Sequence, residues 1–359
     1  MSAPSELTQV ILQNQAERDV ITELGTDQST FKIVKKEFDE STLKDGDVLV
    51  KLLILSNDPT QRAWIQKGVD PKRMYVPPVK VGEAMGSLGI AQVVSSKSSK
   101  WNVGDIVSGK FGWGDYYVAN ENFIFNKVDP NAGLPLPLYL GPVGMTGLTA
   151  YFGLTEILDF KEGQTLIVSA ASGATGSMVV QLAKNVFKAK KVIAICGSDD
   201  KCKWVKSLGA DIGLNYKSPN FKQELIDAVG DEFVDAYFDA VGGSILSQCM
   251  SLIKPFGKVA ACGAISGYND QSKYAVTTWY EIITNRLTVR GFIVGDFKEK
   301  FAQAIGAIVG AIKQGQVSVT QGIELKDLSG DSNKLEKVPA IWNTLFTGKG
   351  EGKLLTKLA

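Results

Sequence analysis

Hydrophobic and polar positions divide the chain into two parts with different patterns. Before about residue 143, short runs of β-branched and aliphatic residues alternate with turns that contain glycine. Runs of this length and composition are typical of β-strands, and several in succession indicate a small barrel or sandwich. The predicted strands cover residues 8–13, 31–34, 47–55, 90–94, 105–108 and 116–119.

After residue 143 the predicted strands alternate with predicted helices. Strand–helix alternation over such a length is typical of a doubly wound parallel sheet. The predicted strands are 165–169, 191–195, 212–216, 234–239, 258–262 and 287–294, and the predicted helices are 176–187, 200–208, 221–229 and 244–253.

The last part of the chain returns to the first pattern. Strands at 317–325 and 353–357 and a helix at 335–346 are expected to rejoin the N-terminal β-structure. The sequence therefore predicts an α/β protein of two domains. The doubly wound sheet would occupy residues 143–317, and the β domain would combine residues 1–142 and 318–359.

Composition and charge argue against some classes of function. The chain has 39 lysines and arginines against 38 aspartates and glutamates, so its formal net charge is only +1. This balance argues against a nucleic-acid binder that relies on phosphate contacts. The sequence contains no histidine. Chemistry that needs imidazole as a base, a relay or a metal ligand is therefore not available to it.

The cysteines and the apolar segments indicate where in the cell the protein is expected. Cys196, Cys202, Cys249 and Cys262 lack the spacing of a structural zinc site and are expected to be reduced thiols. We therefore expect a cytoplasmic protein, with a nuclear location left open. The first residues lack the pattern of a secretory signal. Four prolines interrupt the uncharged run at 130–155, so no membrane span or membrane partner is predicted.

The clearest candidate binding site follows the strand at 165–169. The chain continues there as Ala-Ala-Ser-Gly-Ala-Thr-Gly, a Rossmann-type fingerprint in which Ala170 replaces the first glycine. Small residues allow a tight turn, and the N-terminus of the following helix offers N–H groups and a positive dipole end to a pyrophosphate. The alternative is a tight strand–helix turn without a ligand. The predicted contacts are Gly173, Ala174, Thr175 and Gly176.

The end of the second strand of this sheet indicates which nicotinamide cofactor binds. NAD-selective sites usually place a carboxylate there to bind the ribose 2′-hydroxyl. Here the strand ends in Cys196 and Gly197, and Lys201 follows within a turn. The pattern favours NADP(H), with Lys201 near the 2′-phosphate. Asp199 and Asp200 would then be helix-cap residues, while the alternative for Lys201 is a solvated helix lysine.

Six segments in chain order resemble the medium-chain dehydrogenase/reductase superfamily. They are most similar to its zinc-independent branch of prostaglandin reductases and leukotriene B4 dehydrogenases, which includes alkenal and plant double-bond reductases. The resemblance implies a Rossmann domain beside a GroES-like β-barrel catalytic domain, and a homodimer joined through edge strands of the dinucleotide sheet. The matching segments are 56–62, 144–151, 171–177, 208–211, 237–243 and 262–269.

The chain departs from that family pattern at positions that line the cofactor or substrate in relatives. Thr60 and Gln61 stand where the family usually has Tyr-Met. Ala240 and Gly350 each stand where it usually has asparagine. These departures bear on the identity of the substrate more than on the type of reaction.

The resemblance also implies a shell of cofactor contacts. Tyr216 would approach the cofactor phosphates, with a core aromatic at the sheet edge as its alternative. Met145 and Thr149 would lie beneath the nicotinamide, and the residues that end the sixth strand would meet its carboxamide. The remaining implied contacts are Cys262, Gly263, Ala264, Ile265, Ser266, Tyr268, Phe292, Ile293 and Val294.

The residues available for chemistry favour one reaction class. The first 142 residues contain neither cysteine nor histidine. A catalytic zinc is therefore disfavoured, and no metal site is predicted. Reduction of a carbon–carbon double bond conjugated to a carbonyl needs no metal. Hydride reaches the β-carbon, and the resulting enolate needs a hydrogen-bond donor and then a proton.

Tyr268 is the candidate donor because it follows the fifth strand, at the edge of the sheet where ligands bind. Its alternative role is a loop tyrosine that packs over the cofactor. Arg62 resembles a position of the family's barrel domain near the cleft, which implies a further substrate contact, with a solvated arginine as its alternative. Trp113 is expected to be a packed aromatic at a turn.

The predicted function is an NADPH-dependent reductase of α,β-unsaturated aldehydes and ketones. One alternative is an NADPH:quinone oxidoreductase from a related zinc-free branch. A second alternative is an NADPH-binding protein with little turnover, which the departures at Thr60, Ala240 and Gly350 would allow.

Overall fold

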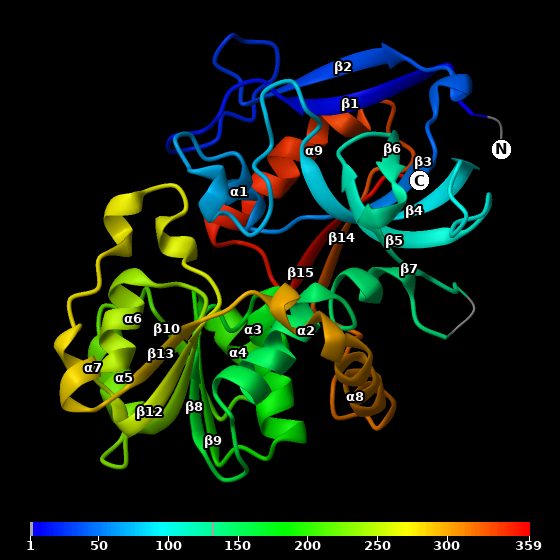
Figure 1. Cartoon of the computed structure of the whole chain (residues 1–359). Helices are drawn as coiled ribbons and strands as arrows, with labels where there is room; N and C mark the ends of the chain where they lie inside the picture. Colours follow the sequence, from blue (N-terminus) through cyan, green and yellow to red (C-terminus); the bar gives the residue numbers. More distant parts are fainter. Residues whose placement is uncertain (1–2, 131–132) are drawn as a thin grey trace. The chain divides into compact units, whose positions relative to one another are not determined.

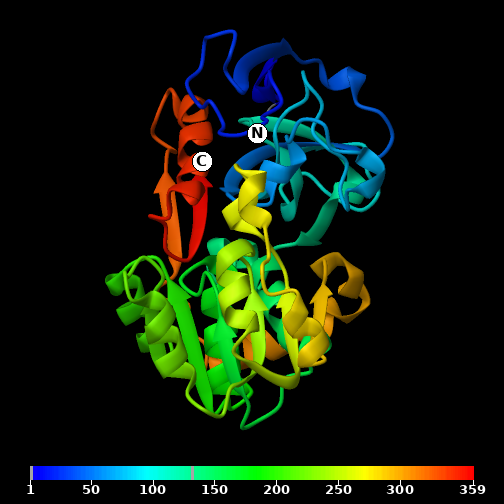
Figure 2. The same ribbon diagram turned by 90° about the vertical axis from the view of Figure 1, so that its left-hand side faces the viewer.

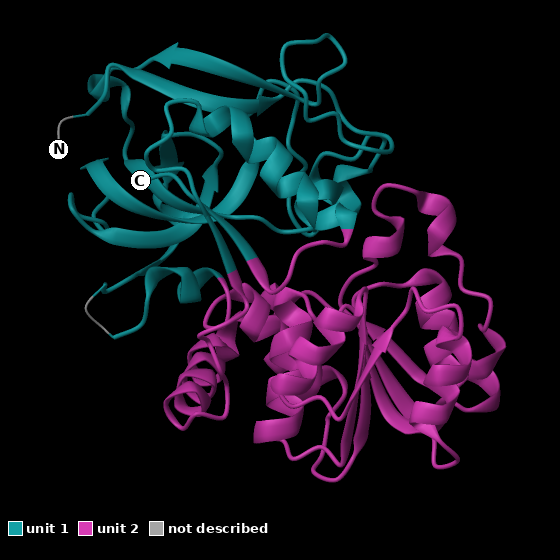
Figure 3. Ribbon diagram, turned by 180° about the vertical axis from the view of Figure 1, so that it is seen from behind, with its two compact units in different colours: residues 1–140, 324–347, 354–359 teal, residues 141–323, 348–353 magenta. Residues whose placement is uncertain are grey.

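The computed structural model of the chain describes residues 3–130 and 133–359 (Figure 1). It divides into two compact units (Figure 3). The N-terminal unit combines residues 1–140, 324–347 and 354–359, and the central unit combines residues 141–323 and 348–353. Within the described ranges, no helix has both the length and the apolar character that a bilayer crossing requires.

The N-terminal unit is built from β-strands, as predicted. In a first sheet, β1 (Glu6–Leu12) pairs antiparallel with β2 (Phe31–Glu37). A second sheet has the order β14-β15-β3-β4-β5-β7, with β6 paired to β3. Figure 2 shows its C-terminal strands β14 and β15, in orange and red, side by side. The bounds are β3 Asp47–Ser56, β4 Gly86–Ser96, β5 Ile106–Gly112, β6 Tyr116–Asn120, β7 Ile124–Lys127, β14 Ile323–Asp327 and β15 Lys353–Lys357.

Aromatic packing ties the C-terminal helix into this unit. Trp342 lies on α9 (Lys334–Asn343), and its ring centroid lies 5.8 Å from that of Trp113 and 6.1 Å from that of Phe31. All three side chains are fully buried. Burying large aromatic side chains is among the strongest stabilising contributions in a core. The structural role predicted for Trp113 is confirmed.

The central unit contains a six-stranded parallel sheet. Its order is β10-β9-β8-β11-β12-β13, and each neighbouring pair is parallel. Counted from β8, this is the order 3-2-1-4-5-6 of a doubly wound dinucleotide fold, which confirms the predicted architecture. The bounds are β8 Thr165–Val168, β9 Lys191–Cys196, β10 Ile212–Asn215, β11 Val234–Asp239, β12 Ile253–Ala261 and β13 Thr288–Gly291.

Helices cover both faces of this sheet (Figure 1). One face carries α3 (Ala174–Gln181) and α4 (Asp199–Ser207), and the other carries α5 (Phe221–Val229) and α6 (Gly243–Met250). Apolar strand residues pack against α5 and α6, because a parallel sheet is buried on both faces. The other helices are α1 Gln61–Trp64, α2 Met145–Phe152, α7 Tyr280–Thr284 and α8 Phe301–Lys313.

Some elements differ from the prediction. Helix α8 was not expected; it contains Gly306 and Gly310, which lower helix propensity. Strand β7 was also not expected, because three of its four residues are exposed and little apolar alternation marks it. The predicted strand 317–325 forms only from residue 323, since Gly322 has a φ of +89° that favours a turn.

The domain bounds also differ. Residues 348–353 were assigned to the β domain, but they contact the central unit. The Gly352 N–H donates to the Ser172 carbonyl at 2.8 Å, and the Lys353 N–H donates to the Gly322 carbonyl at 2.7 Å. These hydrogen bonds place the segment beside the turn that follows β8, so the predicted range 318–359 is corrected at 318–323 and 348–353.

Candidate functional site

The candidate site lies at the carboxyl edge of the six-stranded sheet. The chain order reverses there between β8 and β11, and doubly wound sheets bind ligands outside the strand ends at that point. Every implied cofactor contact except Met145 and Thr149 comes from a turn or helix that follows one of these strands. The structure therefore brings most of the predicted site residues to one edge of one sheet.

The turn after β8 has the geometry of a dinucleotide loop. Ala170 has a φ of +45°, and Gly173 is the N-cap of α3, with no side chain over the helix end. A Cβ atom on Gly176 would lie 2.3 Å from the Ala170 carbonyl oxygen and 2.8 Å from the Ala171 Cα. Gly176 is therefore required for the close approach of helix and turn, and the first N–H groups of α3 are available to an anion.

A buried carboxylate organises the neighbouring turn after β11. Asp239 is 2% exposed and accepts hydrogen bonds from Ser169 Oγ at 3.0 Å and from Tyr237 Oη at 2.7 Å. It also accepts from the N–H groups of Val241 at 3.0 Å and Gly242 at 3.1 Å. Burial, followed by the Asp239 charge, raises the pKa of Tyr237 well above its usual value. Sequence analysis did not identify this network, although residues 237–243 carried the family resemblance.

The turn after β12 is hydrogen-bonded to the turn after β11. The Cys262 N–H donates to the Asp239 carbonyl at 2.8 Å, and Ser266 Oγ donates to the Val241 carbonyl at 2.6 Å. The Tyr268 hydroxyl accepts from the Ala264 N–H at 3.5 Å and lies 3.3 Å from where a Cβ on Gly263 would be. Residues 262–268 thus form one compact turn with the phenol folded back over its start.

Residues implied near the nicotinamide are also brought together. Met145, at the start of α2, and Val294, just after β13, pack against the same apolar cluster of Leu148 and Phe152. Phe292 is 9% exposed and packs edge-on to Phe238 of β11, with ring centroids 6.4 Å apart. The hydroxyl of Thr149 donates to the Met145 carbonyl at 2.7 Å, and Ile293 is partly buried between its neighbours.

The second strand of the sheet leads into a capped helix. Ser198 is the N-cap of α4, and its Oγ accepts from the Lys201 N–H at 3.3 Å. Asp199 and Asp200 are therefore first-turn residues rather than the cap itself. Asp199 Oδ1 accepts from Asn215 Nδ2 at 2.9 Å, and Asp200 pairs with Lys203 at 3.0 Å.

Lys201 is only 7% exposed, so it is not a solvated helix lysine. Its Nζ donates to the carbonyl oxygens of Gly348 at 2.7 Å and Gly350 at 2.6 Å. The ammonium group thus holds the C-terminal segment against α4.

The alternative for Tyr216 is also wrong, because Tyr216 is 43% exposed and not part of the core. Its ring lies over Gly197, where a Cβ would meet the ring at 3.2 Å.

Arg62 lies in the N-terminal unit and is fully buried, so its alternative as a solvated arginine is wrong. Its Nη2 donates to the carbonyl oxygens of Arg18 at 2.6 Å and Ala16 at 3.4 Å. This arrangement supports a structural role in holding the segment after β1. Contact with a substrate stays a prediction.

The thiols are not set up for nucleophilic chemistry. None of the four cysteines forms a disulfide, and Cys196, Cys202 and Cys249 are buried. Burial raises the pKa of Cys196 to about 12, and it also raises the pKa values of Cys202, Cys249 and Cys262. Thiolates are therefore scarce at neutral pH. Among residues 3–130 and 133–359, no three Cys, Asp or Glu side chains group as a metal site.

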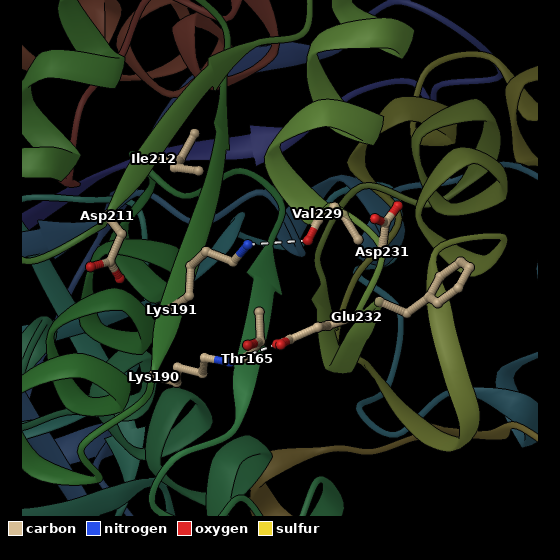
Figure 4. A pocket seen from close by; sticks show the side chains of 10 residues that line it. Thr165, Lys190, Lys191, Asp211, Ile212, Val229, Asp231 and Glu232 are labelled. Carbon is tan, nitrogen blue, oxygen red and sulfur yellow. Dashed lines mark hydrogen bonds and ion pairs between the residues drawn. The ribbon is translucent and has the colours of Figure 1, made fainter.

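A hollow of about 460 Å³ opens at the opposite, amino edge of the same sheet (Figure 4). Both lysines that line it have partners nearby. Lys190 pairs with Glu232 at 2.6 Å, and Lys191 Nζ donates to the carbonyl oxygens of Ala228 at 2.7 Å and Val229 at 3.1 Å. The hollow lies away from the strand ends that carry the candidate site.

Comparisons with known proteins agree with this geometry. A family model described as zinc-binding dehydrogenase matches residues 174–310, and one described as the N-terminal domain of oxidoreductase matches residues 23–126. Prostaglandin reductase 1 of Bos taurus is 36% identical over 88% of this chain and 90% of its own length. The uncharacterized membrane protein YML131W of Saccharomyces cerevisiae is 38% identical over 92% of this chain and 91% of its own.

The fold of the chain is also similar to that of a solved structure. CurA from Vibrio vulnificus, in complex with NADPH, is 28% identical, with a TM-score of 0.81 over 98% of this chain and 99% of that one. The relatives above 30% identity span nearly the whole length of the chain. The chain belongs to the medium-chain dehydrogenase/reductase superfamily, in its zinc-independent prostaglandin reductase branch.

Proposed function

We propose that this protein is an NADPH-dependent reductase of carbon–carbon double bonds conjugated to an aldehyde or ketone. The observation that carries the proposal is the match to prostaglandin reductase 1 along 88% of the chain. The dinucleotide turn and the turn that presents Tyr268 also support it. Both turns lie at the same edge of the six-stranded sheet.

The residues at that edge fit NADP(H). Glycine at position 176 allows the turn after β8 to pack closely against α3, as a pyrophosphate-binding turn requires. The tip of β9 has no carboxylate to bind a ribose 2′-hydroxyl, and Asp199 is hydrogen-bonded to Asn215 instead. Residues 262–266 and 292–294 would line the rest of the cofactor, with Met145 and Thr149 beneath the nicotinamide.

For this reaction the protein needs to position the cofactor and the substrate and to supply one hydrogen-bond donor to the substrate's carbonyl oxygen. When bound, NADPH supplies the hydride that reaches the β-carbon of the substrate. Tyr268 would donate a hydrogen bond to the carbonyl oxygen as negative charge develops on it. A fixed phenol in a partly buried turn stabilises that charge without reorganising at the moment of reaction. The α-carbon would then take its proton from this hydroxyl, a ribose hydroxyl or water.

A paired assay tests this function. Purified protein is mixed with NADPH and either a series of 2-alkenals and enones or a series of quinones, and NADPH absorbance is followed. We expect turnover with the enals and enones, and a saturated carbonyl product by mass spectrometry. Faster turnover of quinones would favour the quinone oxidoreductase alternative. Tight NADPH binding without reduction of either series would favour the binding protein with little turnover.

The homodimer implied by the resemblance is also a proposal. Strand β13 ends the sheet, its four residues are exposed, and no other strand of the described chain pairs with its outer edge. Nearby, Trp279 is 68% exposed, Tyr280 70% and Ile283 62%. An open edge with adjacent apolar groups can pair with the same edge of a second copy about a twofold axis.

We expect Val289→Lys to convert the dimer into a monomer, because a charge on an edge strand disfavours pairing. The molar mass would be measured by light scattering after size exclusion. Val103→Lys, at an exposed turn of the N-terminal unit, is the matched control and should stay dimeric. A monomeric wild type would contradict the dimer, and a dimeric Val289→Lys variant would contradict this interface.

A further inference from the structure

Side chains that attack conjugated aldehydes are few in this chain. It contains no histidine, and burial raises the pKa values of all four cysteines. The thiolate is the reactive form of cysteine, so these thiols react slowly near neutral pH. The other nitrogen nucleophiles among the side chains are lysine amines, which react only when they are neutral. A desolvated lysine without an acidic partner is therefore the strongest candidate for such a reaction.

Lys110 of the N-terminal unit is such a lysine. It lies on β5, its side chain is half-buried, and its Nζ lies 5.2 Å from the centroid of the Trp64 ring. Within residues 3–130 and 133–359, no carboxylate pairs with this ammonium group. By contrast, Lys127 of the adjacent strand β7 pairs with Asp105 at 2.5 Å. Lys110 is thus partly withdrawn from water without a counter-ion, yet it can still be reached from solvent.

The residues around Lys110 are apolar. Leu88 of β4 is its cross-strand partner. A Cβ atom on Gly86 would lie 3.6 Å from Lys110 Cε and 3.6 Å from the Trp64 ring. Desolvation lowers the pKa of Lys110, and no charged group of the described residues contributes to that shift. A larger share of this amine is therefore neutral at a given pH than in an exposed lysine.

We infer that Lys110 is the lysine that α,β-unsaturated aldehydes modify first, by addition of its amine to the β-carbon of the conjugated double bond. The choice of aldehyde rests on the proposed function, since these compounds are the substrates proposed for the reductase. Leu88 is partly exposed beside Lys110 and offers an apolar surface to the alkyl chain of the aldehyde. The sequence alone does not distinguish Lys110 from other lysines, because Trp64 and Gly86 come from other elements.

The addition is balanced without a further reactant. The lone pair of the neutral Lys110 nitrogen forms a bond to the β-carbon, and the π electrons of the double bond move onto the α-carbon and the carbonyl oxygen as an enolate. The α-carbon then takes a proton, and the nitrogen loses one through water. The product is a secondary amine that has gained the mass of one aldehyde molecule, with no net oxidation or reduction.

Peptide mapping by mass spectrometry tests this modification. The full chain is incubated with trans-2-hexenal at neutral pH without NADPH, and each peptide is followed over time for the added mass. We expect the adduct at Lys110 to form about fivefold faster than at Lys313, an exposed lysine at the end of α8, because the larger neutral fraction outweighs the lower nucleophilicity of a weaker base. Because desolvation lowers the pKa of Lys110, its rate should also reach half of its maximum at a lower pH than the rate at Lys313.

Controls separate this reaction from general labelling. Hexanal, which lacks the double bond, is the matched reagent and should leave no stable adduct. Lys110→Arg keeps the positive charge without a nucleophilic amine and should lose the adduct, whereas Lys313→Arg should retain it. Earlier modification of another lysine or of a cysteine would overturn the inference, as would equal rates at Lys110 and Lys313. NADPH oxidation with trans-2-hexenal is measured separately. An adduct at Lys110 without turnover would contradict the proposed function alone, and turnover without the adduct would contradict this inference alone.

Discussion

Replacing Tyr268 by phenylalanine is expected to lower kcat with an enone about 100-fold, the usual effect of removing one donor to a developing oxyanion. The Kd for NADPH should change little, because the ring remains folded over residues 263 and 264. The hydroxyl accepts from the Ala264 N–H over a long distance of 3.5 Å. Turnover would be followed by NADPH absorbance, and binding by fluorescence.

The split between turnover and binding tests the role of this tyrosine. Removing an interaction made mainly in the transition state lowers kcat and kcat/KM together, whereas removing uniform binding raises KM alone. Tyr116→Phe is the matched control, because Tyr116 lies on β6 of the N-terminal unit and outside the turn. Equal losses of turnover and of NADPH affinity in Tyr268→Phe would show that the hydroxyl only supports the cofactor.

Much of the fold could be predicted because its signals are local. The strands at 165–168 and 234–239 are short apolar runs followed by small residues, and they alternate with amphipathic helices. The dinucleotide turn could also be predicted from the sequence. The residues that require glycine at position 176 lie only five and six positions earlier in the chain. Periodicity and a local fingerprint were sufficient for these elements.

The contacts of individual side chains could not be predicted in the same way. Lys201 was expected at a phosphate, but its hydrogen-bond acceptors lie 147 and 149 residues further along the chain. Arg62 was expected near a substrate or in solvent, and its acceptors are backbone carbonyls 44 and 46 residues earlier. Long-range partners of this kind depend on tertiary packing, which no local pattern of residue types encodes.

The Asp239 network also depends on tertiary packing and was not predicted from the sequence. We expect substitution within it to destabilise the central unit more than substitution in its other polar clusters. We expect Asp239→Asn to lower the free energy of unfolding by about 3–5 kcal/mol, the range for breaking a buried charged network. The amide retains an acceptor at the Oδ1 position for Tyr237 Oη, but its NH2 group at the Oδ2 position then faces the Gly242 N–H, which is also a donor. The Tm of the unit should fall by roughly 10 °C.

The same substitution should also weaken NADPH binding, since Asp239 holds two turns at once. Its carboxylate fixes residues 241 and 242, and Val241 in turn accepts from Ser266 of the cofactor-lining turn. Calorimetric unfolding and NADPH titration of Asp239→Asn would be compared with Asp231→Asn, which makes the same chemical change at an exposed turn. A variant as stable as the control would show that neighbouring groups or water satisfy these donors without the carboxylate. A destabilised variant with unchanged NADPH affinity would mean that the turn after β12 keeps its shape without support from the turn after β11.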